Sequence, residues 1–202
     1  MSRELLRDIP FMLIDRRREK LVNAIVYFAR NTNCLGKIKL FKLLYLLDFE
    51  HFRQTGRSVT GLQYRAWKLG PVPLDLMQEW EQPEPDFNAA LEIVPEQVID
   101  HVRQSVRARV DFDDSHFTRR ELDIMQNLVG QYRDTFSPDM IDVTHAENGA
   151  WATVWSAQGF DAEIPYSLSL ADDDENREAI LEAAREYQAM IEARNHGSST
   201  RH

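Results

Sequence analysis

Apolar residues near the start of the chain recur every three or four positions, which is the spacing of one face of an α-helix. The pattern predicts a first helix within residues 16–31 that ends near residues 31–33. Segment 4–14, which precedes it, is expected to form either a short helix or an extended arm. The residues expected on the buried face of the first helix are Leu21, Ile25, Phe28 and Ala29.

The second predicted helix runs from about residue 36 to residue 54, where Gly56 stops it. Its stretch LFKLLYLLDF is apolar on nearly every side. Because a helix that is apolar all round is buried all round, we expect it to be the central helix of a helical domain. Lys42 is expected to lay its stem on the core and extend its ammonium into water, and a direct role in ligand binding is the alternative. Tyr45 and Asp48 point into the same sector, so they must reach a rim or find partners.

The middle of the chain mixes turn residues with segments that resemble strands. Residues 62–67 alternate between apolar and polar side chains, too briefly to separate helix from strand. Pro73 suits the first turn of a helix, and residues 81–88 read as a proline-rich polar loop. Residues 90–94 and 105–112 are β-branched and alternating, which predicts a small hairpin or ribbon.

The second half of the chain returns to helical patterns. Thr118 and Glu121 have the spacing of a capping box before an amphipathic stripe. Further short helices are predicted at Ser137 and within residues 149–158, and residues 164–170 are expected to be extended. The apolar stripe of the helix that follows the capping box consists of Leu122, Met125, Leu128 and Val129.

Residues 171–195 predict a last helix with acids in its first turn, and residues 196–202 are expected to fray. Segment 172–194 carries eight acids and three arginines. Its net charge of -5 is over half of the net charge of -9 of the whole chain. This acidic helix is therefore one possible partner surface, suited to a basic partner that acts on RNA. The stripe expected to face the domain consists of Ile180, Ala184, Tyr187 and Ile191.

Together these elements predict a mainly α (α+β) fold. A single helical domain surrounds a buried central helix and carries a small antiparallel β element and a C-terminal helix. The chain of 202 residues is divided into an N-terminal arm at 1–20, the domain at 21–170, and an acidic helix with a frayed tail at 171–202.

Composition narrows the class of protein. The 33 acidic and 24 basic side chains argue against a protein that coats nucleic acid, so binding of nucleic acid by this chain alone is not expected. The single cysteine allows no intrachain disulfide, which favours a reducing compartment. Apolar runs are too short for a signal peptide or a membrane span, so we expect a cytoplasmic protein with no membrane partner.

Catalytic signatures are absent from the sequence, which contains no phosphate loop, zinc-protease motif or nucleophile elbow. Segment 111–122 resembles a calcium loop, but His116 replaces the required glycine and Leu122 the required acid. His145 and Glu147 could bind a metal or carry a proton, yet no further ligand lies at suitable spacing. We expect His145 to hydrogen-bond a helix junction, and we predict no catalytic residue, cofactor or metal.

The segment YRAWKLGPVP offers the residue types of a protein interface. Trp67 lies between Arg65 and Lys68 in a turn-rich stretch, and tryptophan and arginine dominate interface hot spots. Core packing is the alternative for Trp67. The residues expected to contact a partner are Tyr64, Arg65, Trp67, Lys68, Gly70 and Pro71.

The order of motifs over residues 21–170 resembles the Panacea domain of SocA-like antitoxins. A lysine-rich helix, a T-G turn, an aromatic run and G-P-V follow one another in the first block. A capped acidic turn and a threonine–histidine pair with a later tryptophan come afterwards. The matching residues are Lys39, Lys42, Leu43, Tyr45, Asp48, Gly56, Thr60, Gly61, Tyr64, Gly70, Pro71, Val72, His145 and Trp151.

The resemblance implies an antitoxin that neutralises a cognate protein toxin by direct binding. It also implies an alternative, an adaptor that delivers the toxin to a AAA+ protease such as ClpXP. The family has no established catalytic residues, which agrees with the absence of catalytic motifs. A small enzyme that uses His145 and Glu147, and a transcriptional regulator, are the remaining readings. The negative charge and the lack of a helix-turn-helix pattern argue against the regulator.

Overall fold

The structure is a computed structural model that describes residues 16–98, 101–146 and 149–199, so the predicted arm at 4–14 lies outside it. Its α-helices are α1 (Arg17–Asn31), α2 (Lys37–Thr55), α3 (Leu74–Glu79), α4 (Pro85–Ala90), α5 (Arg119–Tyr132), α6 (Ser137–Thr144), α7 (Ala150–Gln158) and α8 (Arg177–Ser199). Its strands are β1 (Tyr64–Trp67), β2 (Gly70–Pro73), β3 (Leu91–Val98), β4 (His101–Ala108) and β5 (Ala162–Glu163). Two short 3-10 helices are η1 (Asp114–His116) and η2 (Tyr166–Ser169).

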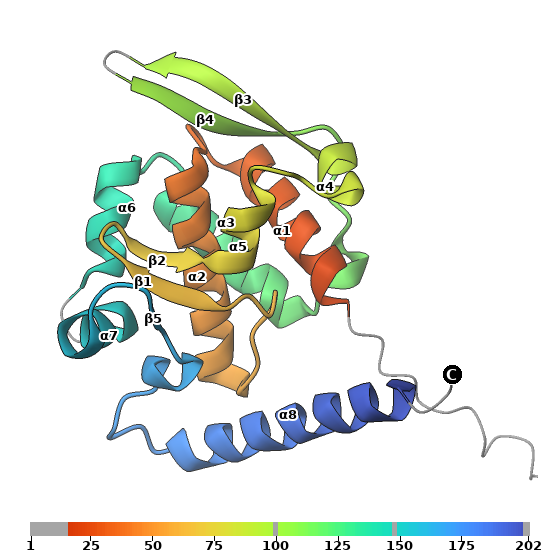
Figure 1. The fold of residues 1–202 in the computed structure, drawn as a ribbon, viewed down its shortest axis with the longest axis vertical. Helices are drawn as coiled ribbons and strands as arrows, with labels where there is room; N and C mark the ends of the chain where they lie inside the picture. Colours follow the sequence, from red (N-terminus) through yellow and green to blue (C-terminus); the bar gives the residue numbers. More distant parts are fainter. Residues whose placement is uncertain (1–15, 99–100, 147–148, 200–202) are drawn as a thin grey trace, which may run out of the picture.

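Helix α2 is the centre of the molecule, as its apolar surface predicts. Helices α1, α5 and α6, strand β2 and η2 all contact it, with α1 and α6 on opposite sides of it in Figure 1. Leu40, Leu43, Leu44 and Leu47 are fully buried. The helix ends at Gly56, whose left-handed φ of 71° closes the C-terminus through a hydrogen bond to the Phe52 carbonyl.

Within segment 62–67, which the sequence left undecided, Tyr64–Trp67 form strand β1 at the centre of a three-stranded sheet with the order β2-β1-β5. Strands β1 and β2 are antiparallel, with Tyr64 opposite Pro73 and Trp67 opposite Gly70. The hairpin contacts α2, and α7 packs behind it against β1 and β5. Both prolines of the G-P-V-P segment are accommodated because the segment is an edge strand.

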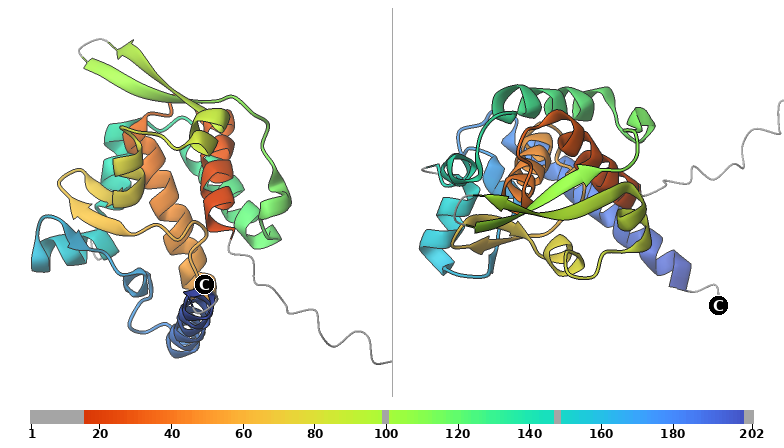
Figure 2. Two further views of the ribbon diagram at one scale, coloured as in Figure 1. Left: turned by 45° about the vertical axis from the view of Figure 1, so that its right-hand side comes forward. Right: turned by 90° about the horizontal axis from the view of Figure 1, so that it is seen from above.

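Strands β3 and β4 form the predicted ribbon, with Leu91 opposite Ala108 and Val98 opposite His101. The ribbon crosses over the ends of α1 and α2 that lie farthest from α8 (Figure 2). It is tied to the α1–α2 loop by the Val106 amide, which donates to the Leu35 carbonyl at 2.8 Å. Strand β4 ends at Ala108, earlier than the predicted segment 105–112.

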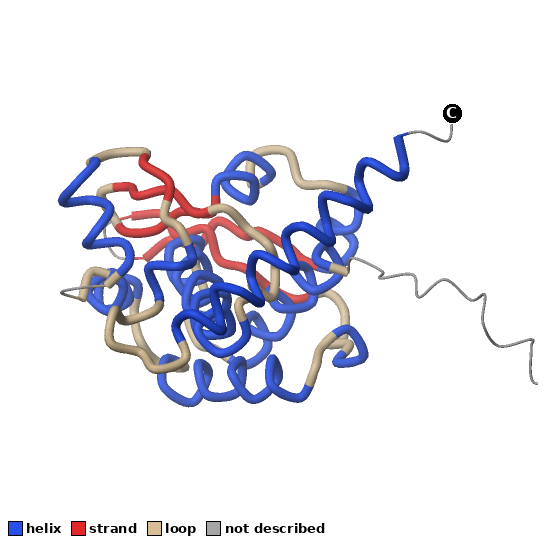
Figure 3. Tube along the Cα trace, turned by 90° about the horizontal axis from the view of Figure 1, so that it is seen from below, coloured by secondary structure: helices blue, strands red, loops and turns tan. Residues whose placement is uncertain are grey.

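Helix α8 crosses the opposite end of α2 and continues past the body of the domain (Figure 3). The approach is close because the C-cap of α2 is a glycine. A Cβ built on Gly56 would lie 2.5 Å from the Ile180 carbonyl oxygen and 2.9 Å from the Ala184 nitrogen. The predicted stripe of α8 is half-buried on this side, whereas Met190 is 40% exposed.

Predicted element boundaries are also wrong in three further segments. The expected loop at 81–88 contains the start of α4, because Pro85 suits the first helical turn and Phe87 is buried against Trp80. The expected extended segment at 164–170 contains η2, where the Leu168 amide donates to the Pro165 carbonyl. Helix α8 begins at residue 177 rather than 171, since acids 172–175 form the preceding turn, and it extends to residue 199 without the predicted fraying at 196.

The fold is mainly α with small antiparallel sheets, as the sequence predicts. The predicted capping box is present in both directions between Thr118 and Glu121. None of the helices in the described part of the chain is long and apolar enough to cross a membrane.

The central position of α2 predicts that Leu44→Ala lowers the free energy of unfolding by about 2–5 kcal/mol, because the fully buried side chain leaves a cavity. Leu69→Ala, at a leucine that is 50% exposed, is the matched control and should cost less than about 1 kcal/mol. Urea unfolding of both variants measures the difference. Equal midpoints for the two variants would show that α2 is not the packing centre.

Candidate functional site

Helix α2 carries a row of buried polar side chains at every third position. A step of three residues turns by about −60° around a helix, so the row winds along α2 and each member meets a different neighbour. The prediction that the Lys42 ammonium reaches water is wrong, because Lys42 is only 2% exposed and bonds inside the domain. The row, called here the polar row, consists of Lys39, Lys42, Tyr45, Asp48 and His51, all of them buried.

Asp48, the fourth residue of the row, is fully buried and accepts four short hydrogen bonds, and the Tyr166 hydroxyl adds a longer one to its Oδ2 at 3.5 Å. Its Oδ1 accepts from the amides of Val59 and Thr60, each at 2.8 Å. Its Oδ2 accepts from the Thr60 hydroxyl and, at 2.8 Å, from the Tyr64 hydroxyl. Burial raises the pKa of Asp48, and the four donors act in the opposite direction by stabilising the carboxylate. The carboxylate therefore fixes both the loop after α2 and the start of β1.

Aromatic rings surround this carboxylate and close it off from solvent. Tyr64 lies edge-on to Tyr45 and Phe49, with ring centroids 5.4 and 5.8 Å away. Tyr166 of η2 stacks on Phe52 at 5.5 Å, and its hydroxyl donates to the Leu62 carbonyl. Burial raises the pKa of both Tyr64 and Tyr166, so both hydroxyls remain available as donors at neutral pH.

Lys42 fixes the turn end of the hairpin. Its Nζ donates to the Pro71 carbonyl at 2.9 Å, and burial lowers its pKa to about 7. The ammonium fits there because residue 70 is glycine. A Cβ on Gly70 would lie 2.6 Å from the Lys42 Nζ and 2.9 Å from the Thr144 Oγ1, and the φ of 99° also disfavours other residues.

Lys39, at the other end of the row, also fixes main-chain segments by donating to their carbonyls. Its Nζ donates to the carbonyls of Asn33, at 2.9 Å, and of Arg133, at 2.8 Å. Arg133 is the C-cap of α5, where a cation also interacts favourably with the helix dipole. Lys39 thus joins the α1–α2 loop to the end of α5.

His145 and Trp151 connect the α6–α7 junction to the same region. Their rings stack with centroids 3.7 Å apart and an interplanar angle of 4°. The Trp151 Nε1–H donates to the Trp67 carbonyl at 3.1 Å, and the Trp151 backbone hydrogen-bonds the Tyr45 hydroxyl. Burial, and then the charge of Lys42, lower the pKa of His145. His145 is the C-cap of α6, where its amide donates to the Ile141 carbonyl at 2.9 Å, and its buried ring Nε2 has no hydrogen-bond partner among the described residues.

The metal or proton-transfer alternative for His145 receives no support from this geometry. Glu147, its proposed partner, lies outside the described residues. Within the described ranges, no three His, Cys, Asp or Glu side chains are grouped so that they could hold a metal ion. Gly61, another residue of the family motif, has a positive φ of 75° and packs against the Arg17 side chain.

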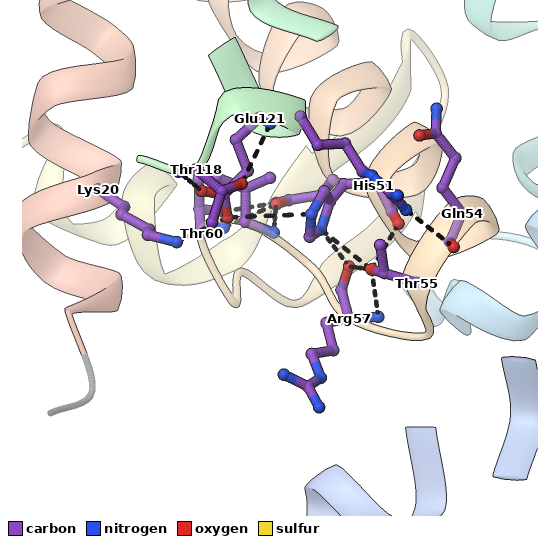
Figure 4. Close-up of polar contacts among 11 residues, drawn as sticks. Lys20, His51, Gln54, Thr55, Arg57, Thr60, Thr118 and Glu121 are labelled. Atoms are coloured by element: carbon purple, nitrogen blue, oxygen red, sulfur yellow. Dashed lines mark hydrogen bonds and ion pairs between the residues drawn. The ribbon is translucent and has the colours of Figure 1, made fainter. Parts of the chain in front are cut away.

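His51, which the sequence did not single out, closes the row at the α8 end (Figure 4). Its Nδ1 lies 2.7 Å from the Arg57 carbonyl, an acceptor, so we assign the proton to Nδ1. Its Nε2 faces the Glu121 Oε1 at 4.0 Å, and that oxygen accepts from the Lys20 Nζ at 2.6 Å. Burial lowers the pKa of His51. The signal that would have found it is the spacing of three along the polar row.

The residues expected to contact a partner are not all on the surface. Tyr64, Gly70 and Pro71 are buried, so the expectation that they belong to an exposed face is wrong. Arg65 and Trp67 are half-buried, and Lys68 is exposed. Tyr64 is buried because its hydroxyl donates a hydrogen bond to the buried Asp48. Gly70 and Pro71 are buried under Lys42 and Thr144.

Two apolar side chains that the sequence analysis missed extend this exposed surface. Leu69 at the hairpin tip is 50% exposed, and Phe160 after α7 is 68% exposed. The Phe160 ring lies 5.7 Å from the Trp67 ring, and the Trp67 Nε1–H donates to the Asp161 Oδ1 at 3.1 Å. We call the surface formed by Trp67, Lys68, Leu69 and Phe160 the hairpin face.

The polar row is suited to holding segments in place rather than to presenting reactive groups. Lys39, Lys42 and His51 each meet a main-chain carbonyl, and Asp48 meets two main-chain amides. Each of these contacts joins α2 to a main-chain group of a loop or strand outside the helix. The row therefore positions the hairpin face without being part of the surface.

The depressed pKa of Lys42 predicts a pH-dependent stability. The folded-state value is about 7, against 10.5 for an ordinary lysine. Between these values the unfolded chain binds more protons, so the free energy of unfolding rises with pH and falls as pH drops through 7. The slope approaches about 1.4 kcal/mol per pH unit. Lys42→Met should reduce the slope, leaving the contributions of Lys37 and Lys39, whose pKa values burial also lowers.

Urea unfolding between about pH 7.5 and about pH 9.5, below the titration of ordinary tyrosines, measures this slope. Lys68→Met, which removes the same charge at an exposed position, is the matched control and should keep the slope of the parent protein. A Lys42→Met variant with an unchanged slope would show that Lys42 is not the titrating group.

Comparison with known protein families matches residues 40–152 to the family described as antitoxin SocA-like, Panacea domain. Searches of curated proteins and of solved structures each returned no match. The matched range contains the polar row from Lys42 onward, the whole β1–β2 hairpin, and His145 and Trp151. It covers more than half of the 202 residues, and the family suggests a role in a toxin–antitoxin system. The chain belongs to the SocA-like antitoxin family that carries the Panacea domain.

Proposed function

We propose that the protein is an antitoxin that neutralises a cognate protein toxin by binding it directly through the hairpin face. Family membership supports the toxin–antitoxin role. The observation that carries the direct contact is the exposed Phe160 ring, which lies 5.7 Å from the ring of the half-buried Trp67 in β1, the strand that leads to the exposed Leu69. Exposed apolar side chains that gather on one surface are typical of protein–protein contacts.

The hairpin face has the rigidity that a tight contact requires. Trp67 is held in β1 by pairing with β2 and by its ring hydrogen bond to Asp161. Arg65 is held nearby, since its Nη1 donates to the Asp161 carbonyl at 3.1 Å. Aromatic and arginine side chains that are fixed before binding lose little entropy on association, and such residues dominate interface energetics.

The binding domain in this proposal extends over residues 21–170. Helix α1 belongs to it because Leu21, Ile25 and Phe28 are buried in the same core as α2. Helix α8 offers the rival surface, since its acids face solvent over much of its length. An acidic helix would favour fast association with a basic toxin, whereas the hairpin face would set the strength of the complex.

Phe160→Ala tests the hairpin face, using the protein encoded by the neighbouring reading frame as the toxin. We expect the dissociation constant to increase roughly 30-fold, about 2 kcal/mol, because an exposed aromatic anchor is lost. Phe136→Ala is the matched control, since Phe136 is 59% exposed and lies between α5 and α6. Growth rescue and binding calorimetry measure the effect, after circular dichroism has established that both variants fold.

Equal affinities for Phe160→Ala and the parent protein would show that the hairpin face is not the contact. The half-life of the toxin separates sequestration from delivery to a AAA+ protease. Sequestration leaves the toxin intact in cells that produce the antitoxin. If the toxin is instead degraded, and only in cells that produce the antitoxin, the adaptor mechanism would hold and neutralisation by binding would not.

A further inference from the structure

We propose that a basic hollow between α1, α5, α8 and the loop after α2 binds a ligand with two or more phosphate groups, of the size of a nucleoside diphosphate or triphosphate. The hollow has a volume of about 660 Å³. This size suits a small-molecule ligand, for which pockets of roughly 300–1,000 Å³ are usual. The side chains that define it are Arg16, Arg17, Lys20, Arg57, Arg120 and Tyr187.

The charge of the hollow is opposite to that of the protein. Five cationic side chains line it, whereas Glu121 is the single acid among the described lining residues. The chain as a whole has a formal charge of -9. A concave surface of one sign focuses the electrostatic field, so the hollow attracts anions although the protein as a whole is negatively charged. Such a concentration of cations in an acidic protein indicates an anionic ligand.

The cations come from elements far apart in the sequence, and Figure 4 shows two of them around the His51–Glu121 network. Lys20 reaches from α1 toward Glu121, which it contacts at 2.6 Å. The Arg57 side chain extends away from this network, from the loop that follows α2. Glu121 pairs with Lys20, whereas Arg57 contacts an aromatic ring and Arg120 a main-chain carbonyl.

Several of these arginines are held in place before any ligand binds. The Arg57 guanidinium lies 4.6 Å from the centre of the Tyr187 ring, and the Arg17 guanidinium lies 5.6 Å from it. The Arg57 carbonyl is fixed by His51. The Arg120 Nη1 donates to the Gln54 carbonyl at 3.3 Å. Pre-ordered side chains lower the entropy cost of binding, which favours a specific site over a diffuse surface charge.

The number and type of cations favour phosphate over a single carboxylate. Guanidinium groups donate two parallel hydrogen bonds to phosphate oxygens, and four arginines line the hollow. A diphosphate or triphosphate carries enough negative charge to engage several of them at once. Since Tyr187 belongs to α8, a bound ligand would also join α8 to α1 and to the loop after α2.

Calorimetric titration with inorganic pyrophosphate and with ATP tests the proposal on the full chain, with adenosine as the uncharged comparison. We expect one binding site per chain for both phosphate compounds and none for adenosine. Arg57→Ala and Arg120→Ala should each weaken binding roughly tenfold or more. Arg107→Ala removes the same charge from the exposed side of β4 and should change binding less than about twofold.

Ligand-induced thermal stabilisation gives a second measurement on the same variants, because a ligand that binds the folded state raises the unfolding temperature. Absence of binding by both pyrophosphate and ATP at millimolar concentration would overturn the proposal. An equal loss of binding in Arg107→Ala would overturn it too, since general charge would then explain the effect. Binding of a single-stranded oligonucleotide without binding of pyrophosphate or ATP would replace it with a nucleic-acid surface.

Discussion

The buried carboxylate of Asp48 is the constraint on which the arrangement of the other elements depends. A carboxylate inside a protein loses its hydration, and only closely placed donors offset that cost. Asp48 obtains them from the amides of Val59 and Thr60 and from the hydroxyls of Thr60 and Tyr64. These donors come from the loop after α2 and from β1. The loop and the hairpin are therefore restricted to positions from which they can donate hydrogen bonds to the carboxylate. The charge therefore specifies the geometry, beyond what apolar packing requires.

The same principle extends along α2 in both directions and connects the core to the surface. Lys42 fixes the turn end of the hairpin through Pro71, and His51 fixes the loop that carries Arg57. The hairpin presents Leu69 at its tip, and the loop presents Arg57 to the basic hollow. Two surfaces with different chemistry, one apolar and one cationic, are thus both held by side chains of one buried helix. A substitution in the polar row would disturb both surfaces without belonging to either.

The helices and the ribbon were predictable because their signals are local. The apolar pattern of residues 40–49 predicted the burial of α2, and the Thr118–Glu121 spacing predicted the capping box. The partners of the polar row were not predictable, since Lys42 meets Pro71 and His51 meets Glu121 only after the chain has folded. The hairpin face was predicted in part. Trp67 and Lys68 lie on it, whereas Tyr64 is buried by its bond to Asp48, a contact that no local pattern reveals. The exposure of Phe160 likewise depends on how the segment after α7 meets β1.

The free energy of unfolding of Asp48→Ala is the most direct measurement of this account. Removing the carboxylate leaves two buried amides and the Tyr64 hydroxyl without their acceptor, and the loss of a buried, hydrogen-bonded charge costs about 3–5 kcal/mol. Glu50→Ala removes an acid from the same helix at a half-buried position, and a cost below about 1 kcal/mol is expected there. The account predicts this large difference between the two variants. An Asp48→Ala protein that unfolds at the same urea concentration as Glu50→Ala would contradict it.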